Sequence, residues 1–152
     1  PSKDAIVEAL VAWDMDEIDQ EFARIVQAPD PMAVLRQLLA VHVMETDCDD
    51  DGALWTEICA AAKRKPRIAE VSARMERAIV DRLVSVFQLV TQSTDAARQE
   101  AFVIEARMLV LLIKASKMQV ADTSDADIEL KLRVQRTIDD ILNSLSKDLP
   151  KC

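Results

Sequence analysis

The stretch from Ile68 to Val90, IAEVSARMERAIVDRLVSVFQLV, decides the fold class of this chain. Residues three or four apart lie on the same face of an α-helix, and apolar residues recur here at that spacing. The positions that share the apolar face are Ile68, Val71, Met75, Ile79, Leu83, Val86 and Val90. Pro66 precedes them and suits the first turn of a helix, so the stretch predicts one long amphipathic helix.

Helical spacing continues on both sides of this segment. Breaks rich in proline or capping residues divide the chain into six helical segments. They are expected to begin after Ser2, at Pro31, near Ala53, at Pro66, near Ala96 and after Ser124. Gly52 is the single glycine in 152 residues, whereas a sheet protein of this size needs several for its hairpins. We therefore predict an all-α bundle of about six helices, one domain over residues 1–149 with a tail at 150–152.

The charge balance argues against a nucleic-acid-binding surface on this chain. Its formal net charge is −8, and Lys63-Arg64-Lys65 is the one dense basic run. A phosphate-binding surface needs clustered Lys and Arg, and single strands also need aromatic side chains on which bases stack. With 3 Phe, 2 Trp and no Tyr, the chain offers few such side chains. We expect no direct contact between this domain and DNA.

The apolar and cysteine patterns predict a cytoplasmic protein without a membrane partner. The most apolar window, Ala101 to Ile113, contains charged residues and is too short to span a bilayer. The three cysteines, Cys48, Cys59 and Cys152, are odd in number and widely spaced, which is typical of reduced thiols.

No catalytic motif is evident, and we predict neither an enzyme nor a bound cofactor. The chain has one histidine, His42, and lacks an HExxH pair, a Gly-rich phosphate loop and a Ser/His/Asp arrangement. The acidic run Glu45 to Asp51 surrounds Cys48 near His42 and suits a metal by residue type. Its spacing does not match an EF-hand, and we favour a solvated loop that caps the next helix. A metal-binding sensor remains the alternative for this segment.

Three segments carry a resemblance to one protein family. Pro1 to Leu10, PSKDAIVEAL, resembles the F-P-S-K-E-x-L-x-x-A segment of TetR-family transcriptional regulators. Asp30 to Leu39 resembles the family's D-P-x-x-x-L-x-x-L-L pattern, and Leu54 to Pro66 its L-W-x-E-x-x-A-x-A-x-R-x-P pattern. The six expected helices match helices four to nine of that family. The chain departs from the pattern at Lys65, where Asp is usual, and lacks two of the family's frequent glycines.

The resemblance implies the ligand-binding and dimerisation domain of a transcriptional repressor. The helix-turn-helix that contacts DNA is expected to lie upstream of Pro1. A small, mainly apolar effector is expected in a pocket between the first four helices and the fifth. The expected ligand-binding residues are Phe22, His42, Trp55, Cys59, Met75, Ile79 and Met108. For each of these the alternative is ordinary core packing, or an internal hydrogen bond in the case of His42. The alternative for the chain as a whole is a helical adaptor without a small ligand.

The last two helices carry more apolar surface than one domain is expected to cover. The fifth is apolar on nearly every side from Phe102 onward, although Glu105 and Arg107 interrupt it. We favour an ion pair between subunits, or an arginine that extends to the rim, over a buried Glu105 that pairs with a ligand or with a residue such as Arg82. The sixth has apolar residues at coiled-coil-like spacing. We therefore expect a homodimer, as in TetR-family proteins. Its expected interface residues are Phe102, Leu109, Ile113, Val134, Ile138, Ile141 and Leu145.

Overall fold

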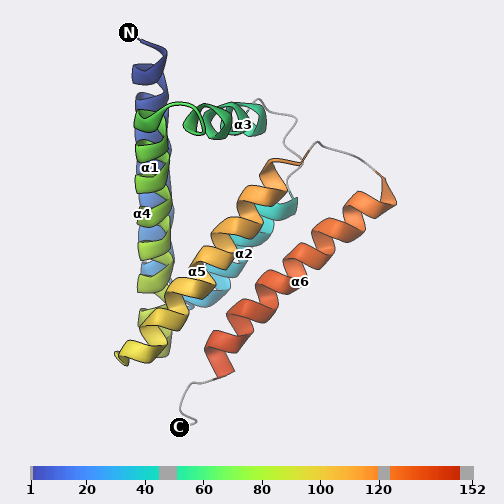
Figure 1. Ribbon diagram of the computed structural model, residues 1–152. Coiled ribbons are helices and arrows are strands. Elements are labelled where there is room, and N and C mark those ends of the chain that lie inside the picture. The colour runs from blue at the N-terminus through green and yellow to red at the C-terminus, as the bar shows by residue number, and fades with distance from the viewer. Residues whose placement is uncertain (1, 45–50, 120–123, 148–152) are drawn as a thin grey trace.

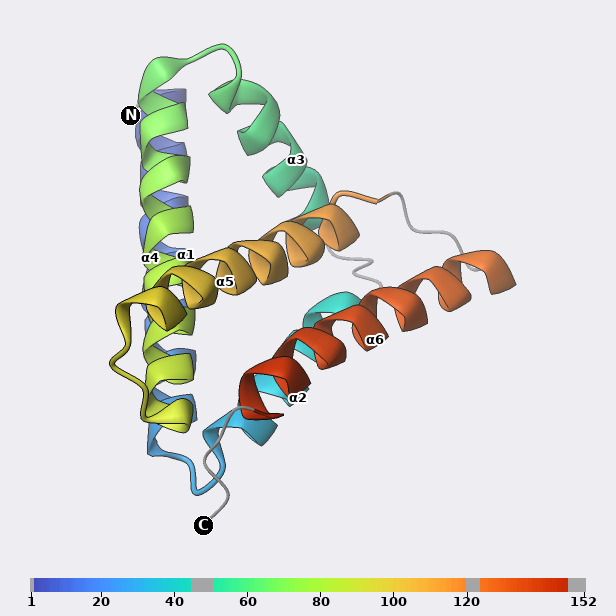
Figure 2. The same ribbon diagram turned by 60° about the horizontal axis from the view of Figure 1, so that its bottom comes forward.

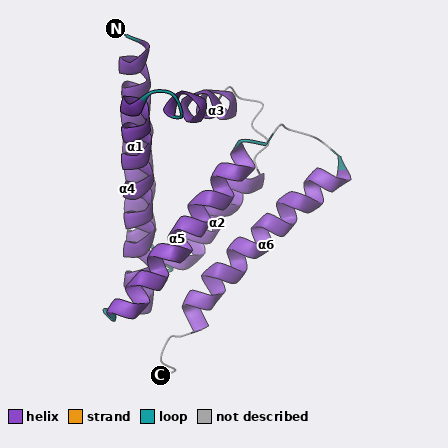
Figure 3. Cartoon of the chain, viewed as in Figure 1, coloured by secondary structure: helices purple, strands orange, loops and turns teal. Residues whose placement is uncertain are grey.

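A computed structural model describes residues 2–44, 51–119 and 124–147 of the chain. Within these ranges the regular structure is helical throughout and confirms the all-α prediction (Figure 3). The six helices are α1 (Lys3–Gln27), α2 (Pro31–Met44), α3 (Asp51–Ala62), α4 (Pro66–Thr91), α5 (Ala96–Lys117) and α6 (Asp125–Lys147). None of the described helices combines the length and hydropathy needed to cross a membrane.

Capping side chains mark the start of α1 and of α2. Ser2 Oγ accepts a hydrogen bond from the Ala5 amide at 3.2 Å at the start of α1. Asp30 Oδ1 accepts from the Ala33 amide at 3.0 Å at the start of α2. These bonds satisfy amides that have no partner inside the helix. At the other end of α4, Gln92 takes a left-handed conformation with φ of 51°, which turns the chain toward α5.

The helices form two groups that meet along α4. α1 and α4 lie side by side as one long pair, and α2, α5 and α6 form the second group (Figures 1 and 2). α3 crosses near the end of the long pair where α1 begins, and it packs against α4. The geometry leaves α4 in contact with helices of both groups.

One hydrophobic core joins the two groups. Its buried side chains come from α1, α2, α4, α5 and α6. Phe87 of α4 and Phe102 of α5 meet edge to face at its centre, with ring centroids 5.9 Å apart. Buried hydrophobic residues outside this cluster lie on α1, α3 and α4: they are Val11, Ile58, Ile68 and Val71.

Candidate functional site

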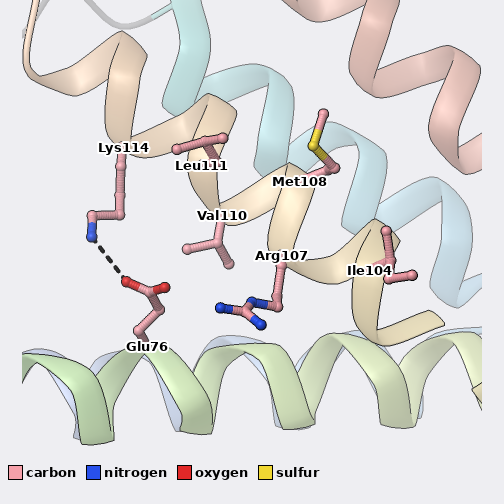
Figure 4. Close-up of a pocket in the computed structure, with 7 residues that line it drawn as sticks. All are labelled: Glu76, Ile104, Arg107, Met108, Val110, Leu111 and Lys114. Atoms are coloured by element: carbon pink, nitrogen blue, oxygen red, sulfur yellow. Dashed lines mark hydrogen bonds and ion pairs between the residues drawn. The ribbon is translucent and has the colours of Figure 1, made fainter. Parts of the chain in front are cut away.

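An open pocket lies between α4 and α5 (Figure 4). Its volume is about 360 Å³ and its surface is mainly apolar. The lining residues are Glu76 of α4 and Ile104, Arg107, Met108, Val110, Leu111 and Lys114 of α5. Pockets that bind small molecules measure roughly 300–1,000 Å³, so this one has the size for a small ligand.

Charged groups lie where the pocket approaches α4. Lys114 Nζ donates a hydrogen bond to Glu76 Oε2 at 2.9 Å, and the two side chains are 48% and 40% exposed. Arg107 also extends from α5 toward α4 (Figure 4) and has no ion pair with another described side chain. Val110 lies between Arg107 and Lys114 (Figure 4) and belongs to the main core. The pocket thus combines a buried apolar floor with one paired and one unpaired cation.

α5 also presents a continuous apolar stripe on its outward face. Seven exposed residues follow one another at spacings that alternate between four and three. They are Ala97, Ala101, Ile104, Met108, Leu111 and Ala115 of α5, and Met118, the C-cap residue that follows it. This is the heptad spacing with which one helix packs along another. Ile104, Met108 and Leu111 belong both to the stripe and to the wall of the pocket.

The expected ligand-binding residues are spread over different surroundings. Phe22 is buried in the main core and Ile79 packs against that core. His42 is half-buried on α2, Trp55 and Cys59 are half-buried on α3, and Met75 is half-buried on α4. Met108 is 41% exposed and is the one member of this set that lines the pocket between α4 and α5. A binding role for the other six remains a prediction.

The residues expected at the dimer interface lie mostly within the core of the single chain. Phe102, Leu109, Ile138 and Leu145 are buried in the core of the single chain. Ile113, Val134 and Ile141 are partly buried and pack against the same core. These side chains face inward because α5 and α6 pack against α2 and α4. The four buried side chains are therefore covered within the single chain, whereas Ile113, Val134 and Ile141 keep part of their surface accessible, and a role of this set in a dimer stays a prediction.

Two ion pairs connect α4 to α1 along the long helix pair. Arg67 contacts Glu8 near one end, and Arg82 contacts Asp19 farther along. Arg82 therefore pairs with Asp19 and not with Glu105, a pairing that was one of the alternatives for that carboxylate. α1 and α4 are also packed against each other along their length.

The acidic run Glu45 to Asp51 is the segment for which the sequence leaves a metal site open. Glu45 and residues 46–50 lie outside the described residues. Among the described side chains, no three His, Cys, Asp or Glu residues lie close enough together to hold a metal ion. The metal-sensor alternative for this segment stays a prediction.

Sequence reasoning missed most of the pocket between α4 and α5. Arg107 and Lys114 are seven residues apart and so share a face of α5, next to the stripe that contains Met108. That spacing could have identified the α5 half of the site. Glu76 of α4 could not be found in this way, because its place opposite Lys114 depends on how the two helices pack.

The chain was compared with protein-family models, with curated proteins and with solved structures, and none of these matches it. The geometry described above therefore carries the functional argument.

Proposed function

We propose that this chain is the regulatory domain of a TetR-type transcriptional repressor. It binds a small, mainly apolar effector and transmits its presence to a DNA-binding domain outside this chain. In this proposal the domain is cytoplasmic, needs no cofactor and catalyses no reaction. The observation that carries the proposal is the pocket between α4 and α5. One side of this pocket is α4, which packs along α1 and forms ion pairs with it.

The proposed mechanism follows from this connection. An effector that fills the pocket separates α4 from α5, and α4 carries α1 with it through their packing and ion pairs. In this proposal α1 is the helix that connects the domain to the DNA-binding domain. In a dimer, a shift of both α1 helices changes the spacing of two DNA-reading domains, which must match the spacing of their half-sites.

We further propose that the domain is a homodimer held by the outward stripe of α5. The stripe has heptad spacing, and α5 of a second copy offers the same spacing to a two-fold partner. Ile104, at 58% exposed, and Leu111, at 60% exposed, are large apolar side chains that water contacts in the single chain. Since both also line the pocket, the second copy's α5 forms its outer wall in this dimer.

The test is a thermal-shift screen of the wild-type chain with an apolar small-molecule library. An effector that binds the folded state raises the melting temperature in proportion to saturation. Leu111→Gln should weaken that shift, because it places a polar group in the pocket wall. Leu132→Gln is the matched control, since Leu132 is an exposed leucine of α6 outside this pocket. A library that gives no shift would count against the effector proposal.

The second candidate function is a helical adaptor that binds no small ligand. The exposed stripe of α5 favours it, because an amphipathic helix of another protein would fit the same surface. The two candidate functions differ in the partner of the stripe, which is a second copy of this chain in the first and a helix of another protein in the second. A purified chain that is monomeric and fails the ligand screen supports the adaptor.

A further inference from the structure

We infer that the pocket between α4 and α5 selects an amphipathic monoanion, an apolar body that carries one carboxylate. This inference rests on the proposed function and specifies the chemical class of its effector. The first observation that supports it is that the residues lining the pocket fall into an apolar group and a charged group. Ile104, Met108 and Leu111 offer an apolar wall, whereas Arg107, Lys114 and Glu76 supply the polar groups.

The charges of the pocket favour an anion. Lys114 is neutralised by Glu76 through their 2.9 Å hydrogen bond. Arg107 has no acidic partner among the described side chains, which leaves the pocket with one excess positive charge. A guanidinium binds a carboxylate through two parallel hydrogen bonds, which a neutral alcohol cannot reproduce. One excess charge matches a monoanion, and a dianion would keep an uncompensated charge.

The position of Arg107 gives the ligand an orientation. Its side chain points into the space between the helices, beside Val110 at the apolar floor (Figure 4). A carboxylate on Arg107 therefore faces α4, and the apolar body lies along the exposed side chains of α5. The volume of about 360 Å³ lies near the lower end of the roughly 300–1,000 Å³ typical of small-molecule pockets, which favours a small ligand. Decanoate is a small molecule with one apolar chain and one carboxylate, and it serves as the probe.

The experiment is isothermal titration calorimetry of the wild-type chain with decanoate, 1-decanol and decylammonium, which share one apolar body. Decanoate should bind about tenfold more tightly than decanol, the difference typical of hydrogen bonds to a charged group. Arg107→Met should remove that advantage and leave decanol binding unchanged. Lys114→Gln should also weaken decanoate binding, because it leaves the Glu76 carboxylate to repel the anion. Arg24→Met, an exposed arginine of α1 outside the pocket, is the matched control and should change neither ligand.

Equal affinity for decanoate and decanol, or decanoate binding that survives Arg107→Met, would overturn the inference while leaving the effector site in place. Tightest binding of decylammonium would also overturn it, since Glu76 would then be the recognising group. If none of the three ligands binds saturably, the inference fails, and the thermal-shift screen decides separately whether the proposed function fails with it.

Discussion

Replacing Ile104 and Leu111 together by serine should convert the proposed dimer into a monomer. Both side chains lie on the outward stripe of α5, and they remain 58% and 60% exposed in the single chain. Neither belongs to the main core. The double variant should therefore keep the fold of the chain and lose the contacts with a second copy, along with two apolar side chains of the pocket wall.

The size of the effect follows from these exposures. Full burial of an Ile or Leu side chain contributes about 1.5–3 kcal/mol. Because 58% and 60% of the two side chains is still exposed, covering them with a partner helix adds roughly 1–2 kcal/mol each. A two-fold dimer contains each side chain once in each copy, which makes four buried side chains in all. The double replacement therefore removes roughly 4–7 kcal/mol from the free energy of dimerisation. At about 1.4 kcal/mol per factor of ten, the dissociation constant rises about a thousandfold to a hundred-thousandfold.

Analytical ultracentrifugation over micromolar concentrations measures this change. The wild-type chain should sediment as a dimer and the double variant as a monomer, with similar helical circular dichroism. Ile128→Ser with Leu132→Ser is the matched control, since both are exposed apolar residues of α6 outside the stripe. A monomeric wild type, a variant that stays dimeric, or a control that dissociates equally would refute the assignment of the interface to α5.

Two further predictions concern α6. Ile138→Glu should prevent folding, and not only pairing, because Ile138 is completely buried in the chain's own core; helical circular dichroism that survives the change would contradict that burial. Hydrogen bonds from Arg133 and then Arg136 lower the pKa of Glu129 below its ordinary value of 4.5. The stability from this carboxylate is therefore present above that value and is lost as pH falls through the lower, folded-state pKa. Carbon-detected NMR titration should show the lowered pKa, and Arg133→Gln should bring it back toward 4.5.

Local signals in the sequence were sufficient to predict the helices. Ser2, Asp30 and Ser124 precede helices that begin at the predicted places, and Pro66 opens α4 as expected. A cap acts on amides within three residues of itself, and helical spacing is a property of one segment. Both signals can be read without knowledge of the neighbouring helices. The helical spacing also predicted the apolar face of α4, on which Ile68, Val71, Leu83 and Val86 are buried.

The direction in which α5 faces was decided only by the tertiary structure. From the sequence, the helix is apolar both at Phe102 and Leu109 and at Ile104 and Leu111, and either side could meet the core. Packing against α2 and α4 buries Phe102 and Leu109, and it leaves Ile104 and Leu111 outside. The pocket too depends on the tertiary structure, because packing of α4 against α5 brings Glu76 to Lys114. Periodicity specifies which residues share a face, but the face that becomes buried depends on the surfaces that neighbouring helices bring to it.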